Sequence, residues 1–325
     1  MTTDADIWVL VDDRAGNRAQ ALGVAERLGQ PFRTVEIRYA LPARLPNMLL
    51  GASLAGLDTA SKASLTQPWP KLVIAAGRRS APVARWIRKQ SAGQTRLVQI
   101  MDPGSGHADF DLICRPAHDS GSSLADNVMS ITAAPHRMSE TALQAARTAW
   151  QEAVKDLPAP RIALLIGGAT RRRSFSDDMA RALCAAASKA CAALGGSLMV
   201  TTSRRTGAVV DTIETSLTGA YQLFRWDRGG DNPYAGYLAL ADAVIVTGES
   251  VSMCSEAVAS GKPVYIYAPS ALVTPKHARL HSNLVAGGHA RMFDGKLDLD
   301  WQPVPLDAAQ QIADAIVERN LWGDV

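Results

Sequence analysis

The 325-residue sequence has few of the features that mark several common classes of protein. Aromatic residues make up only 6% and the formal net charge is +3, too little stacking surface and basic excess for a nucleic-acid-binding protein. We therefore expect no nucleic acid among its partners. No uninterrupted apolar run approaches the roughly 20 residues that cross a bilayer. The first residues, Met1 to Ile7, are acidic and lack the basic region of a signal peptide.

Cysteine and histidine are also too scattered for the usual disulfide or metal frameworks. The four cysteines show no C-x-x-C spacing, which favours a reducing compartment. His277 and His281 have helical ligand spacing, but no third ligand accompanies them, so we expect no metal and no cofactor. These features predict a cytoplasmic protein, and a peripheral position at the inner membrane stays open.

The sequence is rich in short apolar runs that alternate with helical patterns. Hydrophobic residues make up 47%, and the length suggests two domains of roughly 150 residues. Nearly continuous apolar runs, such as those at 7–11, 71–77, 161–168 and 242–248, predict strands buried on both faces of parallel sheets. We predict an α/β protein with two doubly wound, Rossmann-like domains, 1–156 and 157–325, divided near Leu157 by a proline-containing segment.

Polar, glycine-containing turns follow the predicted strands in both domains. They cover residues 12–17, 77–80, 167–173, 201–207 and 247–252. In open parallel sheets, ligands bind outside the carboxyl ends of the strands. We therefore expect the two domains to face each other across a ligand-binding cleft.

Two turns of the second domain have the composition of a diphosphate site. Gly167 and Gly168 could form a backbone anion nest, and Arg172 and Arg173 could neutralise a pyrophosphate, although a solvated loop would look the same. The turn lacks the endings of both the Walker loop and the dinucleotide fingerprint. The second turn, with Ser203, Arg204 and Arg205, precedes a helix whose N-terminus also suits phosphate, and such charges stabilise a leaving nucleoside diphosphate.

The segment from Ala241 to Pro269 predicts a strand, a small polar turn, a helix and a second strand. Gly248, Ser250 and Ser252 in the turn let a diphosphate approach free N–H groups at the start of the helix. Glu256 lies one and a half turns further, where a carboxylate could accept hydrogen bonds from ribose hydroxyls. This is the layout of a nucleotide-sugar pocket, although an ordinary strand-turn-helix unit with a solvated glutamate would fit too.

In the first domain, Asp12 and Asp13 follow the first strand and are our candidates for the base that deprotonates an acceptor hydroxyl. Arg14 and Asn17, and Gly77 and Arg78 after a later strand, would complete the acceptor side. Capping by Asp13 or Asn17, with an ion pair to Arg14, explains the same residues at least as well. His107 and His118 are alternative bases.

The segment from Leu41 to Leu57 holds an apolar run flanked by Arg44 and Lys62. Such a helix could rest in a membrane interface and present a lipid-linked acceptor. A buried helix or a lid is the alternative.

Taken together, these motifs resemble a known family. Six segments look like those of the mitochondrial-fission elongated-mitochondria (ELM1-like) family and its bacterial homologues. They are Trp8 to Asn17 with Gln20, Gly77-Arg78, the Gly167-Gly168 turn, Thr202 to Thr206, Asn232 to Tyr234 and Thr247 to Met253. The resemblance spans nearly the whole chain. It implies a fold like that of GT-B glycosyltransferases, many of which return their last helix, here Leu306 to Arg319, to the first domain.

The resemblance does not by itself assign an activity. Plant members are described as recruiting a dynamin-related protein to mitochondria, a role not transferred to a chain that looks bacterial. Compared with glycosyltransferases that act on lipid carriers, Ser250 replaces a usual glycine and Met253 a hydroxyl residue, whereas Glu256 matches their ribose-binding carboxylate. We expect a metal-independent glycosyltransferase that uses a nucleoside-diphosphate sugar as substrate. The alternatives are a non-catalytic scaffold that recruits a partner at a membrane, and a nucleotide-sugar epimerase.

Overall fold

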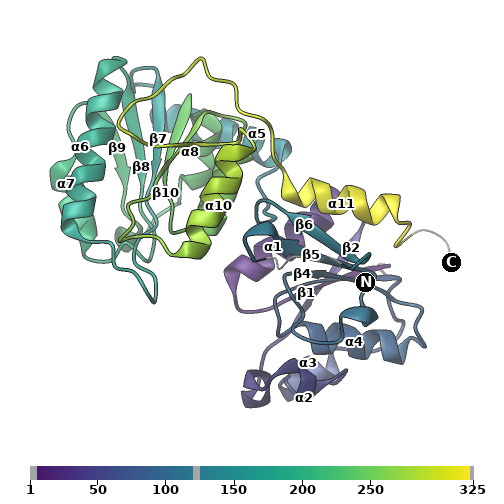
Figure 1. The fold of residues 1–325 in the computed structure, drawn as a ribbon. Coiled ribbons are helices and arrows are strands. Elements are labelled where there is room, and N and C mark those ends of the chain that lie inside the picture. The colour runs from purple at the N-terminus through teal and green to yellow at the C-terminus, as the bar shows by residue number, and fades with distance from the viewer. Residues whose placement is uncertain (1–5, 120–124, 323–325) are drawn as a thin grey trace. The chain divides into compact units, whose positions relative to one another are not determined.

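The computed structural model describes residues 6–119 and 125–322. Most of the acidic N-terminal segment, which we expect not to be a signal peptide, lies outside the described residues. The chain forms two compact units, residues 1–137 with 307–325 and residues 138–306, each built on its own six-stranded sheet (Figure 1). Every strand pairing within the two sheets is parallel.

The first unit has the strand order β2-β1-β3-β4-β5-β6. Its strands are β1 (Ile7–Val11), β2 (Phe32–Glu36), β3 (Leu72–Ala76), β4 (Arg96–Ile100), β5 (Leu112–Pro116) and β6 (Val128–Ile131). Its helices are α1 (Ala15–Arg27), α2 (Asn47–Leu50), α3 (Thr59–Ala63), α4 (Ala81–Gln90) and α11 (Ala308–Glu318). All residues of β1 and β3 are buried, because these central strands have apolar clusters packed on both faces.

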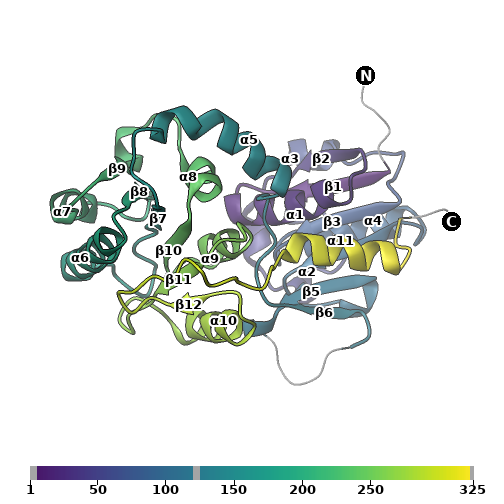
Figure 2. The ribbon, with the colours of Figure 1, turned by 90° about the horizontal axis from the view of Figure 1, so that it is seen from above.

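The second unit has the order β12-β11-β10-β7-β8-β9, which is the Rossmann strand order when it is read from β9. Its strands are β7 (Arg161–Leu165), β8 (Ser197–Thr201), β9 (Tyr221–Phe224), β10 (Ala243–Thr247), β11 (Val264–Tyr267) and β12 (Arg291–Met292). Its helices are α5 (Glu140–Trp150), α6 (Asp177–Ala193), α7 (Val209–Ser216), α8 (Tyr234–Leu240), α9 (Val251–Val258) and α10 (Pro275–Ala286). Figure 2 shows α6 and α7 on one face of this sheet and α8 and α9 on the other.

Short 3-10 helices complete both units. They are η1 (Leu41–Arg44), η2 (His107–Asp109), η3 (Ala117–Asp119), η4 (Gln151–Val154) and η5 (Trp226–Arg228). Each expected strand is present within one to three residues of its expected ends. The short edge strands β6 and β12 were not expected, since two to four residues of mixed polarity carry no clear alternation.

The division between the units differs from the boundary expected near Leu157. Helix α5 belongs to the second unit because it packs along α8, where a Cβ on Gly236 would overlap the Trp150 ring and Arg147 donates to the carbonyl of Ala239. The prolines after α5 therefore lie inside the second unit, and the first unit ends at Arg137.

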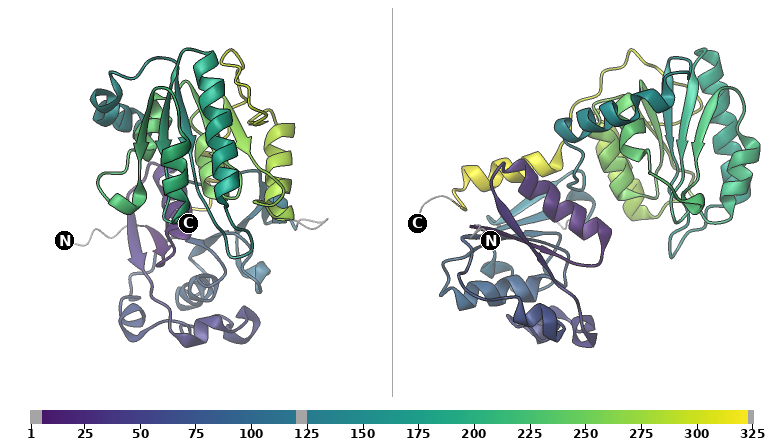
Figure 3. Two further views of the ribbon diagram at one scale, coloured as in Figure 1. Left: turned by 90° about the vertical axis from the view of Figure 1, so that its left-hand side faces the viewer. Right: turned by 180° about the vertical axis from the view of Figure 1, so that it is seen from behind.

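The C-terminal helix α11 returns to the first unit and packs against α1 (Figure 3). Asp307 caps α11 by accepting hydrogen bonds from the N–H groups of Ala309 and Gln310. The same carboxylate accepts two hydrogen bonds from Arg27 at the end of α1, at 2.7 and 3.0 Å. One residue thus both begins α11 and fixes it to α1.

Candidate functional site

The chemistry-bearing turns of the second unit meet at the carboxyl ends of β7 and β10, where the strand order reverses. Gly167 donates its N–H to the Thr247 hydroxyl at 2.8 Å, and Gly168 donates to Oε1 of Glu249 at 2.7 Å. A Cβ on Gly167 would overlap Oε1 of Glu249, and one on Gly168, which has φ of +139°, would overlap the carbonyl of Arg205. Both positions therefore require glycine.

This arrangement changes the role we expected for the glycine turn. Its N–H groups were predicted to form an open anion nest, but those of Gly167 and Gly168 are already donated to Thr247 and Glu249, and that of Ala169 to Arg205. The turn therefore links the carboxyl ends of β7 and β10. Contacts to an anionic ligand fall instead to side chains around it.

The turn after β8 is fastened to the same glycines. The hydroxyl groups of Ser203 and Thr206 both donate to the Gly167 carbonyl, at 2.5 and 2.6 Å, and the N–H of Arg205 donates to the Ser203 hydroxyl. Ser203, predicted to bind phosphate, is thus committed to this turn. The adjacent Arg204 is exposed and forms no ion pair within the described residues.

The arginine run after Gly168 is exposed. Thr170 closes the turn by accepting from the N–H of Arg173 and by donating its own N–H to the Arg173 carbonyl. In the part of the chain that the structure describes, Arg171, Arg172 and Arg173 have no carboxylate partner. Their guanidinium groups remain available for an anionic ligand.

Helix α9 carries Glu256, the predicted ribose ligand. The Tyr234 hydroxyl, at the start of α8, donates to Oε2 of Glu256 at 2.7 Å, and burial raises the pKa of this carboxyl. The side chain is half-buried and is not turned out to bulk water. Oε1 has no partner among the described residues and can still accept a hydrogen bond.

The start of α9 lies beside this carboxylate. Ser250 occupies the N-cap but makes no side-chain cap, so it leaves the first N–H groups of the helix without a side-chain partner. Ser252 is exposed in the first turn. The carbonyl of Gly248 accepts a hydrogen bond from Nε2 of His281 at 2.7 Å, and a Cβ on Gly248 would overlap that imidazole.

Glu249 is the residue that our sequence reasoning missed. Its side chain is fully buried, its Oε1 accepts the Gly168 N–H, and its Oε2 is buried without a hydrogen-bond partner. Burial raises the pKa of this carboxyl, against the lowering effects of the Gly168 N–H and the Arg205 guanidinium. The available signal was an acidic residue two positions after a largely apolar strand, at the point where the order of strands reverses.

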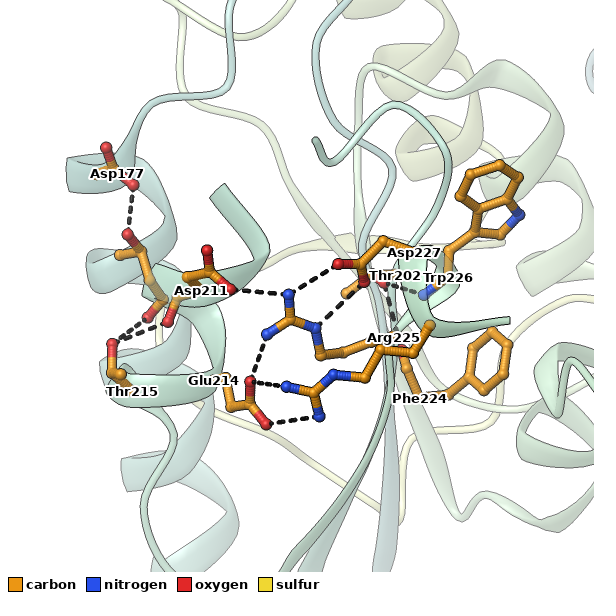
Figure 4. Close-up of polar contacts among 11 residues, drawn as sticks. Asp177, Thr202, Asp211, Glu214, Thr215, Phe224, Arg225, Trp226 and Asp227 are labelled. Carbon is orange, nitrogen blue, oxygen red and sulfur yellow. Dashed lines mark hydrogen bonds and ion pairs between the residues drawn. The ribbon is translucent and has the colours of Figure 1, made fainter. Parts of the chain in front are cut away.

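A cavity of about 360 Å³ lies between the turns after β8 and β9. Its walls include Thr202, Arg204, Arg225 and Trp226. Figure 4 shows Arg225 surrounded by Asp211, Glu214 and Asp227, and these ion pairs leave only 9% of its side chain exposed. Because Arg225 is engaged by these carboxylates, Arg204 is the cationic side chain of the lining that stays available, and the half-exposed Trp226 lines the same cavity.

No metal site was expected, and the histidines of α10 have other roles. His277 takes part in the capping box of α10 with Thr274, and burial lowers the pKa of both His277 and His281. Within residues 6–119 and 125–322, no group of three or more His, Cys, Asp or Glu side chains is arranged to hold a metal ion.

In the first unit, the two candidate bases have different surroundings. Asp12 is buried and accepts hydrogen bonds from the N–H of Arg14 and the side-chain amide of Asn17. Asp13 is exposed and makes no contact of this kind among the described residues. Asp12 therefore holds the turn, which is the role that the alternative interpretation gave to Asp13, and Asp13 is the better placed of the two to meet a ligand.

Gly77 and Arg78, predicted to face the acceptor, are engaged within the first unit. Gly77 has φ of +86°, and a Cβ there would press against the Asn17 amide. Arg78 donates to the carbonyl of Leu45 and to Oδ1 of Asn47, both at 2.8 Å. The Asn47 amide in turn donates to the carbonyls of Arg78 and Pro103. These bonds hold the 41–50 segment in place.

The 41–57 segment is not one apolar helix. It forms η1 and α2, a turn, and a bridge between Tyr39 and Leu57. Its apolar side chains do not all pack inward, since Leu41, Leu45, Met48 and Leu49 are exposed. We call these four residues the apolar tip. No helix within the described residues is both long and apolar enough to span a membrane.

The fold is that of the GT-B enzymes. A UDP-GlcNAc 2-epimerase from Neisseria meningitidis, solved with UDP-GlcNAc bound, superposes with a TM-score of 0.56 over 98% of this chain and 100% of that chain, at 11% identity. The glycosyltransferase SnogD from Streptomyces nogalater has a TM-score of 0.52 over 97% and 94% of the two chains, at 12% identity. At such low identity the likeness shows the fold alone.

The relationship in sequence is more specific. Residues 15–320 match the family described as Mitochondrial fission ELM1, so this chain belongs to that family. It is 30% identical to an uncharacterized protein of Rickettsia prowazekii, over 96% of this chain and 97% of that protein. It is 29% identical to the Mitochondrial fission protein ELM1 of Arabidopsis thaliana, over 82% of this chain and 68% of that protein. The resemblance noted in the sequence is confirmed, whereas the cleft between the units stays a prediction.

Proposed function

We propose that the second unit binds a nucleoside-diphosphate sugar and that the protein transfers the sugar to an acceptor. The observation that carries this proposal lies at the carboxyl ends of the strands of the second sheet. The turns after β7 and β8 hold arginines that have no carboxylate partner among the described residues, and the helix after β10 has an N-cap residue without a side-chain cap and a half-buried carboxylate. The arginines are Arg171, Arg172, Arg173 and Arg204, and the carboxylate is Glu256.

Each group has a chemical role in this proposal. Arg204 and the 171–173 arginines bind the diphosphate and stabilise the charge that grows on it as the sugar bond breaks. Oε1 of Glu256 accepts a hydrogen bond from ribose. The cavity beside Trp226 takes the base, because an exposed indole offers a flat apolar surface for stacking. Asp13 accepts the proton of the acceptor hydroxyl.

Calorimetry with UDP, GDP, ADP and CMP tests the donor site. Replacing Arg204 with Gln should weaken binding of the best ligand about tenfold, since one charge-assisted hydrogen bond contributes about 1.5 kcal/mol. Arg181→Gln is the matched control, because Arg181 is exposed on α6 and pairs only with Asp178. Equal affinities for both variants, or no binding of any nucleotide by the native protein, would remove the basis for a donor site.

Two other activities are separated by product analysis. A neighbour in fold is a 2-epimerase, and epimerisation needs no acceptor, so a changed sugar configuration after incubation with UDP-GlcNAc alone would favour that activity. A non-catalytic role, as the name of the Arabidopsis relative suggests, would be favoured if nucleotides bind to neither the native protein nor its variants.

We further propose that the apolar tip places the protein at a lipid surface. Arg78 and Asn47 hold the segment rigidly while Met48 and Leu49 stay 79% and 68% exposed. Insertion of one such side chain contributes about 1.5–3 kcal/mol, so Met48→Ser with Leu49→Ser should lower binding to anionic vesicles at least tenfold. Met292→Ser with Val317→Ser, two exposed positions elsewhere, is the control. Equal vesicle binding by both double variants would contradict this proposal.

A further inference from the structure

The buried carboxylate of Glu249 has one oxygen bonded and one oxygen without a partner. Oε1 accepts the N–H of Gly168 at 2.7 Å and lies 3.5 Å from Nη2 of Arg205. Oε2 is buried and forms no hydrogen bond with any residue that the structure describes. An ionised carboxylate in this state lacks much of the solvation that it would have in water, and this makes the charged form costly.

Arg205 connects this buried group to the proposed diphosphate site. Its side chain is 35% exposed, and Glu249 is its only acidic partner within the described residues. The 3.5 Å separation is longer than a good hydrogen bond, so the guanidinium is not locked onto the carboxylate. Arg205 can therefore turn toward an anion that reaches the turn after β8, next to Arg204.

We propose that Glu249 takes up one proton when the diphosphate of a nucleotide sugar binds, so that donor binding is coupled to pH through the pair Arg205 and Glu249. The inference rests on the function proposed above. In the free protein, the ionised carboxylate is balanced by Arg205. In the complex, the diphosphate and the carboxylate would compete for one guanidinium, and two like charges close together disfavour ionisation of the weaker acid.

The proton balance is simple. One proton leaves the solvent and is bound at Oε2, the oxygen without a partner, while Oε1 keeps the hydrogen bond from Gly168. No other covalent bond forms or breaks within the protein, Arg205 turns from Glu249 to the diphosphate, and the charge of the carboxyl changes from −1 to 0. Burial already raises the pKa of Glu249, in the direction that this uptake requires.

The other titratable groups around Glu249 do not account for the same effect. Burial lowers the pKa of His277 and His281 on α10, which disfavours the protonated imidazolium form of both side chains. Lys276 stands beside His277 and lowers its pKa further. Cys254 on α9 is held as a thiol, because burial raises its pKa strongly.

The experiment measures the affinity for UDP-GlcNAc, GDP-mannose and ADP-glucose by calorimetry between about pH 5 and 9. Each phosphate of these ligands has one ester and one anhydride bond and no second acidic proton, so the phosphates do not titrate in this range. Between the pKa of Glu249 in the free protein and its higher pKa in the complex, the native protein should lose affinity about tenfold per pH unit, as linkage to one proton requires. Glu249→Gln should lose this dependence, match the native protein at the acid end and bind at least tenfold more tightly at the alkaline end.

Two further measurements test whether Glu249 is the group that takes up the proton. Glu152→Gln, an exposed glutamate in η4 that pairs with Lys155, is the control and should keep the native profile. Titrations of the native protein in two buffers of different ionisation enthalpy count the protons directly and need no variant. Binding without proton uptake, or a Glu249→Gln profile as steep as that of the native protein, would overturn the inference but leave the donor site standing. Absence of binding by all three ligands would overturn both.

Discussion

The close packing of the Gly167-Gly168 turn leads to a quantitative prediction. In Gly167→Ala, the new Cβ overlaps Oε1 of Glu249 and pushes the carboxylate away from the Gly168 N–H. Loss of a partner for a buried N–H costs about 1–3 kcal/mol, and the overlap itself about 1–3 kcal/mol. The expected loss is therefore about 2–6 kcal/mol, which lowers the melting temperature of the second unit by at least about 4 °C.

Gly16→Ala is the matched control, because no atom lies within 4 Å of a Cβ placed on Gly16. Gly16 is in the first turn of α1, where alanine is the better helix former, so the control should gain up to about 1 kcal/mol. Hydrogen exchange measured on peptides from β7 and β10 for one variant, and from α1 for the other, reports each change locally. A Gly167→Ala protein with native protection in β7 and β10 would refute the close-packing argument.

Three more predictions concern single side chains. In Glu256→Gln, the Tyr234 hydrogen bond keeps its acceptor. Because the pKa of Glu256 is raised, the native state binds more protons than the unfolded chain, and native stability falls as pH rises above about 4.3. Urea unfolding should therefore show the variant to be more stable than the native protein at about pH 8 but not at about pH 4. Asp307→Ala removes the cap of α11 and the ion pair that Asp307 forms with Arg27 of α1, so α11 should become about tenfold more sensitive to limited proteolysis, and equal cleavage would contradict the anchoring role. Asn47→Ala leaves the carbonyls of Arg78 and Pro103 without their donor and should cost about 2–4 kcal/mol in urea unfolding, against less than about 0.5 kcal/mol for the exposed Gln310→Ala.

Much of the architecture could be predicted because the central strands are mostly apolar, and β1 and β3 are apolar at every position. A strand of this kind is buried on both faces only in a parallel sheet covered by helices, and its length and flanking turns are visible in the residues. The short edge strands β6 and β12 lack this signal. Helix α5 was assigned to the wrong side of the division, because the groove that Gly236 leaves for Trp150 depends on residues that are more than 80 positions apart.

The candidate site was predicted in part, by position rather than by role. Turns after parallel strands were expected to carry the chemistry: Arg204 and the 171–173 arginines do lie in such turns, and Glu256 lies on the helix that follows such a turn. The partners of each side chain could not be predicted. Arg78 holds the 41–50 segment, Ser203 fastens the glycine turn, and Asp12 rather than Asp13 is committed to its own loop.

Sequence alone determined the alternation of strands and helices, the positions of the polar turns and the membership in the ELM1 family, because these depend on the order of residues along the chain. Tertiary structure decided which polar groups bond to other groups of the protein and which remain available to a ligand. Glu249 shows the difference: its place after β10 is local, but the hydrogen bond from Gly168 to Oε1, the nearby Arg205 guanidinium and the burial of Oε2 arise only when the turns fold together.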